Sequence, residues 1–320
     1  MKNKILIIGG DPNSINSEII FKCWKKLTST QKKNIYIISN YDLLKNQFKI
    51  LKYPIKISKV ENINQNIVSN KLKILDLKLR FKNPFKVANK FSSIFVRESL
   101  NLAHKIASKE NIKGIINCPV DKKLLTKKNQ GVTEYLADKC RIKDGSEVML
   151  IKSKNFSVSP ITTHLDLKNV VNKINSKLIL KKINTIEKWF KKIYKKSPKI
   201  GLLGLNPHNA ELKKNSEEKK IIIPTIKRSR KKGFKVTGPL VADTVFINEY
   251  KKYDVIVGMY HDQVLAPFKT IFKFDAINIT LGLKYLRLSP DHGVAKDIIK
   301  KKIANPRSLL RCIEFLNKLK

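Results

Sequence analysis

The sequence predicts an α/β protein with two lobes, each built on a mainly parallel sheet with flanking helices. Apolar runs of strand length recur along the 320 residues, and longer segments with helical periodicity lie between them. This alternation is typical of parallel sheets, because neighbouring parallel strands must be joined by a crossover that is usually a helix. The length suits one large domain or two ordinary ones. Hydrophobic residues make up 42% of the chain, which is enough to fill a core.

Strands are predicted where short runs rich in Ile, Val and Leu are bounded by polar or turn-forming residues. The predicted strands are Lys4–Ile8, Ile35–Ser39, Gly114–Asn117, Val148–Ile151, Val158–Thr162, Ile200–Leu205, Asp254–Gly258 and Ala276–Thr280.

Helices are predicted where longer segments repeat apolar residues at helical spacing, as at positions 170, 171, 174, 178 and 179. The predicted helices are Ser17–Leu27, Ser92–Lys109, Val170–Tyr194, Glu217–Lys232 and Ser308–Leu319. Residues 40–90 are rich in Lys and weakly periodic, so no element is assigned there.

The chain contains neither an internal repeat nor a low-complexity linker, which argues against a string of separate domains. We therefore expect two α/β lobes that share an active-site cleft. The first lobe is placed at residues 1–125 and is joined by about 290–320. The second lobe is placed at residues 126–289.

The sequence has no membrane span, since no run reaches the roughly 18 apolar residues that a crossing needs. The N-terminal MKNKILIIGGDP has a basic start, but its apolar stretch is short and leads into a turn, so a strand is predicted rather than a signal peptide. The four cysteines lie far apart with no CxxC pair, which fits reduced thiols. We expect a cytoplasmic protein with no membrane partner.

The formal net charge of +42 is the most unusual property of the composition. A basic footprint is the first sign of a nucleic-acid-binding protein. Here, however, the excess is nearly all Lys and is spread over the whole length. Ile and Asn are also abundant, and all three residues share A/T-rich codons, so mutational bias is a sufficient explanation. We therefore expect solvated Lys faces and no nucleic-acid partner.

Three of the five histidines immediately follow predicted strands: His164 ends SPITTH, His208 ends GLLGLNPH and His261 ends VIVGMYH. In open α/β sheets, ligands bind at the carboxyl ends of the strands. Neutral imidazole is a good ligand for zinc and cobalt, and three imidazoles leave positions open for catalysis. The alternative for each is a hydrogen-bonded residue at a strand end. His104, in the middle of a predicted helix, is interpreted as a helix-face residue.

Further downstream, Lys269 and Arg287 lie among apolar neighbours, as suits a phosphate or carboxylate contact. The Asp291-His292-Gly293 turn could bring backbone close to a cofactor, although a lone His-Gly is weak support.

At the front of the chain, Gly9-Gly10 follows the first predicted strand but does not form a GxGxxG motif. The alternative there is a turn in which Asp11, Ser14 or Ser17 lies near a helix N-cap.

Together, these segments resemble the 4-hydroxythreonine-4-phosphate dehydrogenase family of pyridoxal phosphate biosynthesis. The motifs that carry the resemblance cover nearly the whole chain in order: GGDP, NCPVDK, GVTEYLAD, TTHLDL, GLNPHNAE, EEKKIIIPTI, GPLVADTVF, MYHDQVLAPFK and NITLGLKYLRLSPDHGVAKDI. The resemblance implies a two-lobed homodimeric enzyme related to isocitrate and isopropylmalate dehydrogenases, with active sites at the dimer interface. Such an enzyme oxidises a phosphorylated hydroxyamino acid with NAD or NADP, and the resulting β-keto acid loses carbon dioxide.

The resemblance also implies roles for individual residues. A divalent metal (zinc, cobalt or magnesium) would be held by His164, His208 and His261. The substrate contacts would be Thr133, Lys269, Asn278 and Arg287. Lys269, Asp262 and Asp243 are candidate catalytic residues, with either carboxylate orienting a histidine or accepting a proton. The loop Asp291, His292 and Gly293 is a candidate for the adenosine side of the cofactor.

Three departures from the family pattern concern the loops. Val132 stands where the family usually has His before Thr133, and valine cannot donate to a phosphate oxygen. A hydrogen bond to a charged group contributes about 1.5–3 kcal/mol, so its loss predicts roughly ten- to a hundredfold weaker binding or turnover. The segments NSINSE and NAELKKN replace Gly-rich stretches. Two alternatives therefore stay open: a paralogue that oxidises threonate or erythronate phosphate, and a non-catalytic metal- or nucleic-acid-binding protein.

Overall fold

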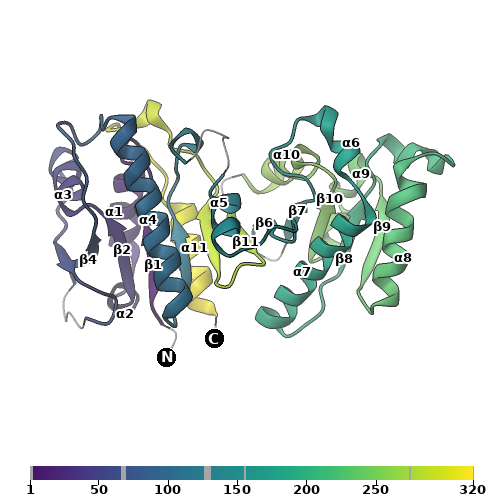
Figure 1. Cartoon of the computed structure of the whole chain (residues 1–320), viewed down its shortest axis with the longest axis horizontal. Helices are drawn as coiled ribbons and strands as arrows, with labels where there is room; N and C mark the ends of the chain where they lie inside the picture. Colours follow the sequence, from purple (N-terminus) through teal and green to yellow (C-terminus); the bar gives the residue numbers. More distant parts are fainter. Residues whose placement is uncertain (1–2, 66–69, 126–130, 155, 274, 320) are drawn as a thin grey trace. The chain divides into compact units, whose positions relative to one another are not determined.

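The computed structural model describes residues 3–65, 70–125, 131–154, 156–273 and 275–319 (Figure 1). The chain divides into two compact units. Unit 1 comprises Met1–Cys140 and Lys284–Lys320, and unit 2 comprises Arg141–Leu283. The first boundary lies beyond the predicted residue 125 because helix α5 (Val132–Lys139) packs against α4 (Asn89–Lys109) of unit 1.

Unit 1 contains a parallel sheet in which every described strand pair runs in the same direction. The order across the sheet is β3 (Ile57–Val60), β4 (Leu72–Asp76), β2 (Ile35–Ser39), β1 (Ile5–Ile8), β5 (Gly114–Asn117) and β12 (Arg287–Pro290). All residues of β1, β2 and β5 are buried, as expected for strands covered by helices on both faces.

The three predicted helices of unit 1 are found with ends shifted by at most three residues, and the side chains of Thr28 and Asn40 cap two further helices. The helices of unit 1 are α1 (Asn16–Lys26), α2 (Ser29–Lys33), α3 (Tyr41–Ile50), α4, α5 and α11 (Arg307–Lys318), with short 3-10 turns η1 (Lys122–Leu124) and η6 (Lys296–Ile298). Helix α4 packs on β1, β2 and β5, whereas α11 packs on β5, β12 and α1.

Unit 2 contains a mixed sheet. Its order is β11 (Ile277–Leu281), β6 (Val148–Lys152), β7 (Ser157–Pro160), β10 (Val255–Gly258), β8 (Ile200–Leu203) and β9 (Val236–Leu240). Strand β6 is antiparallel to both neighbours, while β7, β10, β8 and β9 are parallel. The carboxyl ends of β7, β10 and β8 therefore meet at one edge of the sheet.

Short helical turns connect many of the strands of unit 2. Its helical elements are η2 (Leu167–Asn169), α6 (Val170–Lys173), α7 (Ser176–Tyr194), η3 (Pro207–Leu212), η4 (Glu218–Ile222), α8 (Ile223–Lys231), α9 (Ala242–Val245), η5 (Glu249–Lys252) and α10 (His261–Phe272). The predicted helix over 170–194 is interrupted because Asn175 adopts an extended conformation and its side chain caps the Leu178 amide at 2.9 Å.

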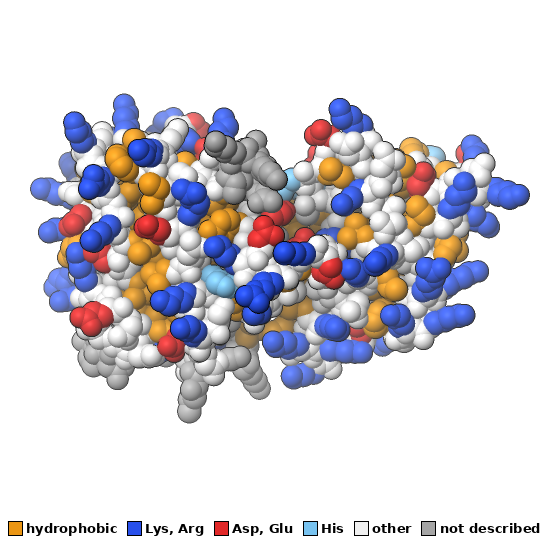
Figure 2. All heavy atoms as spheres, viewed as in Figure 1, with side chains coloured by type: hydrophobic (Ala, Val, Ile, Leu, Met, Phe, Trp, Pro, Cys, Tyr) orange, Lys and Arg blue, Asp and Glu red, His pale blue; other side chains and the backbone are white. Residues whose placement is uncertain are grey.

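All eight predicted strands are confirmed, with ends shifted by at most two residues. Strands β3, β4, β9 and β12 had not been predicted. Of the helices in the described part of the chain, none combines the length and hydropathy that a membrane crossing needs. Lysine and arginine side chains are scattered over the visible face of the molecule (Figure 2), as expected for solvated charge.

Candidate functional site

Two of the three strand-end histidines come together at the carboxyl edge of the sheet in unit 2. The loops after β7 and β10 are joined by three hydrogen bonds. The Thr162 amide and hydroxyl donate to the carbonyl of Met259 at 3.1 and 2.8 Å, and the Ile161 amide donates to that of Gly258 at 2.8 Å. As a result, the ring centroids of His164 and His261 lie 6.0 Å apart.

His261 is the first residue of α10, and Asp262 lies in the first turn of that helix. The Nδ1 of His261 is 2.7 Å from a carboxylate oxygen of Asp262. Because an ionised carboxylate only accepts hydrogen bonds, Nδ1 is the donor in this pair, and the neutral tautomer of this kind leaves the Nε2 lone pair for a metal. This pairing is the one that orients histidine ligands in metal sites.

His208 does not join the pair. It begins a run of five non-glycine residues, 208–212, whose φ angles all lie near +50°. Left-handed backbone costs roughly 1–2 kcal/mol for each residue with a Cβ atom, so the segment that replaces the expected Gly-rich loop is strained. Within the described ranges, no three His, Cys, Asp or Glu side chains are grouped closely enough to hold a metal ion.

The loop that carries His208 is held by Glu218, a residue to which sequence reasoning gave no role. One carboxylate oxygen of Glu218 accepts hydrogen bonds from the amides of Leu205 and Asn206, both at 2.8 Å. Burial by itself raises the pKa of this carboxyl, but the hydrogen bonds from Asn206 and Leu205 lower it below its usual value. The carboxylate therefore stays charged and fixes the start of the loop.

Gln263 was also missed, although it lies inside the MYHDQ motif. Its Oε1 accepts from the amide of Met259 and its Nε2 donates to the carbonyl of Gly204, both at 2.7 Å. One side chain thus links the end of β10 to the end of β8. A polar residue two positions after a strand-end histidine was the available signal.

The other predicted residues of unit 2 are placed as follows. Lys269 lies on α10, two turns beyond His261, and Asn278 lies on β11. The Oδ1 of Asn278 is buried and accepts no hydrogen bond from any described residue. A buried polar atom without a partner needs an explanation, and a bound ligand is one. Asp243 is exposed on α9.

In unit 1, Arg287 and Thr133 are in contact. Arg287 is only 3% exposed, and its guanidinium donates to Asn117 Oδ1 through Nε and to Thr133 Oγ1 through Nη1, the latter at 3.2 Å. Burial lowers the pKa of Arg287 to about 10, so it remains charged at neutral pH. Val132, the first residue of α5, immediately precedes Thr133.

The predicted cofactor loop follows β12. The amide of Asp291 donates a hydrogen bond of 2.9 Å to the Ser308 hydroxyl, and Nδ1 of His292 is 2.9 Å from the carbonyl of Gly293. The Nε2 of His292 is buried without a partner among the described residues. Burial lowers the pKa of His292, which keeps the imidazole neutral.

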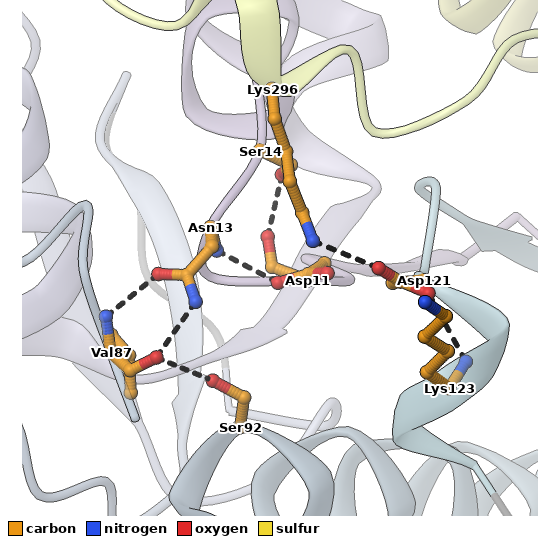
Figure 3. Close-up of polar contacts among 8 residues, drawn as sticks. All are labelled: Asp11, Asn13, Ser14, Val87, Ser92, Asp121, Lys123 and Lys296. Carbon is orange, nitrogen blue, oxygen red and sulfur yellow. Dashed lines mark hydrogen bonds and ion pairs between the residues drawn. The ribbon is translucent and has the colours of Figure 1, made fainter. Parts of the chain in front are cut away.

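The turn after β1 is joined to the residue that follows this loop, because the Ile15 amide donates to the Val294 carbonyl at 3.2 Å. Figure 3 shows the turn with Lys296 beside it. Asp11 is 2% exposed; its carboxylate accepts from the Asn13 amide at 2.8 Å and its carbonyl accepts from the Ser14 hydroxyl. Beside it, Lys296 of η6 pairs with Asp121 at 2.8 Å. The predicted N-cap interaction takes a different form: α1 begins at Asn16, whose amide donates to the Ser14 hydroxyl.

Comparison with known proteins identifies the family. The family model described as "Pyridoxal phosphate biosynthetic protein PdxA" matches residues 31–316. The chain belongs to the PdxA family. It is 36% identical to the 4-hydroxythreonine-4-phosphate dehydrogenase of Sulfurihydrogenibium sp. (strain YO3AOP1), over 99% of this chain and 98% of that protein. It is 31% identical, over 95% of this chain and 94% of the relative, to the Oceanobacillus iheyensis protein named "Putative D-threonate 4-phosphate dehydrogenase".

Solved structures confirm the predicted PdxA-type fold. A crystal structure of 4-hydroxythreonine-4-phosphate dehydrogenase from Klebsiella pneumoniae superposes with a TM-score of 0.85 at 26% identity, covering 98% of each chain. A β-decarboxylating dehydrogenase from Thermococcus kodakarensis has a TM-score of 0.52 at 13% identity, covering 99% of this chain and 82% of that one. The second likeness concerns the fold alone.

Proposed function

We propose that this PdxA-family chain oxidises 4-hydroxythreonine 4-phosphate with NAD or NADP, in the biosynthesis of pyridoxal 5'-phosphate. The observation that carries the proposal is the pair His164 and His261, oriented by Asp262 at the carboxyl edge of the sheet. The resulting β-keto acid then loses carbon dioxide. A homodimer in the cytoplasm is proposed with it, and the four buried, free cysteines support a reducing compartment.

The donor set fits a divalent metal. A ring nitrogen lies about 2.0–2.1 Å from a bound zinc ion, so two imidazoles with centroids 6.0 Å apart can share one ion. Nitrogen donors suit zinc or cobalt better than magnesium. We propose His208 as the third ligand, which requires the strained 208–212 segment to bring its imidazole to the pair. A bound metal would lower the pKa of the substrate hydroxyl and polarise the carbonyl that forms from it.

The remaining residues would bind the substrate and move its proton. Lys269 and Arg287 are proposed to hold its anionic groups, with Thr133 completing the Arg287 contact. The unpartnered Oδ1 of Asn278 offers an acceptor to a substrate N–H or O–H group. Holding the alcohol carbon against the nicotinamide lets the hydride pass to the cofactor while the hydroxyl proton leaves to a base.

Two carboxylates are candidates for that proton. Asp262 already contacts His261, so its proposed role is to orient the ligand. Asp243 has no such contact among the described residues and is the proposed proton acceptor. The loop Asp291, His292 and Gly293 is proposed for the adenosine side of the cofactor, where the buried Nε2 of His292 can accept a hydrogen bond.

A second candidate is the oxidation of D-threonate or erythronate 4-phosphate. Val132 favours it, because a smaller, apolar residue beside Thr133 changes the polar contacts available to the substrate. The relative from Oceanobacillus iheyensis carries the name of such an activity.

The test is NAD- and NADP-linked oxidation of the three phosphorylated substrates, followed by the absorbance of the reduced cofactor. The proposal expects the highest kcat/KM with 4-hydroxythreonine 4-phosphate, loss of turnover with a chelator, and recovery on adding zinc or cobalt. Preference for threonate or erythronate phosphate would establish the second candidate instead. No oxidation of any of the three with metal and cofactor present would refute both.

A further inference from the structure

Unit 2 contains a concave site at the opposite end of its strands from the histidines. A cavity of about 370 Å³ is lined by residues that lead into three neighbouring parallel strands. Lys199 immediately precedes β8, Lys235 immediately precedes β9, and Tyr253 lies two residues before β10. Because a four-residue strand spans about 13 Å, the sheet separates this cavity from the edge that carries His208 and His261.

The cavity is strongly basic. Lys199, Arg230, Lys235 and Lys252 all line it, and no acidic residue does. Lys252 is neutralised in part by Glu249 at 2.9 Å. Within the residues that the structure describes, the side chains of Lys199, Arg230 and Lys235 form no ion pair. Lys199 nevertheless lies beside a carboxylate, since Asp254 accepts a hydrogen bond of 2.8 Å from the Lys199 amide. Arg230 and Lys235 are therefore the two cations that are left to attract an anionic group into the cavity.

Arg230 is held in place by the fold. Its Nε donates a hydrogen bond of 2.8 Å to the carbonyl of Val236, the first residue of β9. This bond fixes one edge of the planar guanidinium, while the two terminal nitrogens keep donors for an oxyanion. A guanidinium positioned in advance loses less conformational entropy on binding than a freely moving lysine does.

Two aromatic rings complete the lining. Phe234 and Tyr253 are half-buried walls of the cavity, and aromatic faces are stacking platforms for planar rings. The volume lies within the range of small-molecule pockets, about 300–1,000 Å³, and far exceeds what one phosphate ion fills. Charge, ring faces and volume together favour a ligand that combines a planar ring with a phosphate.

We propose that this cavity, lined by Lys199, Arg230, Phe234, Lys235, Lys252 and Tyr253, binds a phosphate-bearing aromatic small molecule. Arg230 and Lys235 hold the phosphate, and Phe234 and Tyr253 hold the ring. The site is separate from the proposed dehydrogenase centre and does not require that centre to be active.

Isothermal titration calorimetry on the full-length protein tests the proposal, at 150 mM salt to screen non-specific attraction. The main probe is pyridoxine 5'-phosphate, which has a ring and a phosphate but no aldehyde to react with lysines. Adenosine monophosphate is a second ring-bearing probe, while pyridoxine and inorganic phosphate each supply one half of the ligand. The variant is the double substitution R230Q/K235Q. Its matched control is K231Q/K232Q, which removes the same charge from two exposed neighbours outside the cavity.

The expected result is that at least one ring-bearing phosphate binds ten times more tightly than either half-ligand. R230Q/K235Q should raise its Kd at least tenfold, K231Q/K232Q should change it less than twofold, and F234L should raise it about threefold. Equal Kd values for wild type and R230Q/K235Q, or equal losses in both double variants, overturn the site. Inorganic phosphate binding as tightly as the ring-bearing probes overturns the assignment of the ligand class.

A separate readout distinguishes this proposal from the proposed enzymatic activity. Neither double variant removes a residue of the dehydrogenase centre, so the NAD(P)-linked kcat in the absence of the probe should match wild type. Circular dichroism checks that R230Q/K235Q is folded. R230Q/K235Q can thus lose binding of the probe while it keeps dehydrogenase turnover. Conversely, the wild-type protein can bind the probe even if it shows no turnover.

Discussion

Arg287, at the start of β12, donates a hydrogen bond of 3.2 Å to Thr133 in the first turn of α5. The same guanidinium donates to Asn117, the last residue of β5. Three segments far apart in sequence thus fix one buried cation. The cation at this position is the group that we propose to hold an anionic part of the substrate.

The substitution Arg287→Lys should lower kcat/KM by about ten- to a hundredfold, because lysine keeps the charge but cannot reach Asn117, Thr133 and an anion with one planar fork. Steady-state kinetics with 4-hydroxythreonine 4-phosphate measures the change. Arg311→Lys, at a half-buried position of α11 where the guanidinium pairs with Glu314 at 3.0 Å, is the matched control and should stay within twofold of wild type. An equal, small effect of both substitutions would remove Arg287 from the substrate site.

Restoring a histidine at Val132 should increase kcat/KM for 4-hydroxythreonine 4-phosphate by about ten- to a hundredfold, since a donor to a phosphate oxygen contributes about 1.5–3 kcal/mol. Val132→Ile, which keeps an apolar side chain at the start of α5, is the control. If Val132→His lowers turnover while threonate phosphate remains the better substrate of wild type, the valine marks a change of specificity.

Metal binding should depend on His164 and His261. Alanine at either position leaves one imidazole of the pair, so zinc content after dialysis should fall from about one ion per chain to well below half. His208→Ala should reduce it as well if the 208–212 segment delivers the third ligand. His104→Ala is the control, because His104 lies on α4 and contacts Tyr285 instead. Mass-spectrometric metal analysis reports the stoichiometry without needing turnover.

The sequence predicted best those strands that consist of one continuous apolar run. The run Ile35–Ser39 is β-rich and uninterrupted because both faces of β2 are covered, and its bounds were predicted without error. Strands β9 and β12 were missed because Pro239 and Arg287 interrupt the apolar pattern. The charge of Arg287 is tolerated within a buried strand because its guanidinium donates a hydrogen bond to Asn117. Such a contact between distant residues cannot be read from the local sequence.

Some residues of the candidate site could likewise be predicted from the sequence, and others could not. A histidine after a strand could be predicted from the sequence, because parallel strands bring their carboxyl ends to one edge. The roles of Glu218 and Gln263 could not, because each depends on amides from a distant loop. The left-handed backbone at His208 could not be predicted either, since residues such as Ala210 and Leu212 rarely adopt positive φ.

The strain in the 208–212 segment can be measured. Ala210 has a φ of 48°, where glycine is free of the Cβ penalty. Ala210→Gly should therefore raise the free energy of unfolding by about 1 kcal/mol, less the entropy that glycine adds to the unfolded chain. Ala107→Gly, within α4, should lower it by about 1 kcal/mol. Urea denaturation of both variants gives the comparison, and destabilisation by both would mean that the segment is not strained at Ala210.

Lys73 provides a prediction that depends on pH. Its side chain is 2% exposed on β4, donates to the Lys33 carbonyl and lies 4.2 Å from the Tyr36 ring centroid. Burial, with a smaller effect of Lys4, lowers the pKa of Lys73 to about 8. The folded protein therefore loses this proton near pH 8, whereas the unfolded chain keeps it to about 10.4. Between these values the unfolded state binds more protons, so this residue makes stability rise with pH.

Lys73→Met removes the buried charge and should stabilise the protein most at pH 7. The ionised lysine costs on the order of 2–3 kcal/mol there, partly offset by the lost hydrogen bond to Lys33, so a net gain of about 1–2 kcal/mol is expected. The gain should shrink as the pH is raised from 8 to 10, because wild type then folds with a neutral amine. Lys78→Met, at an exposed position nearby, controls for the added methionine. Urea unfolding of the three proteins at pH 7, 8, 9 and 10 provides the measurement, and a difference between wild type and Lys73→Met that does not change with pH would show that the buried amine does not titrate in this range.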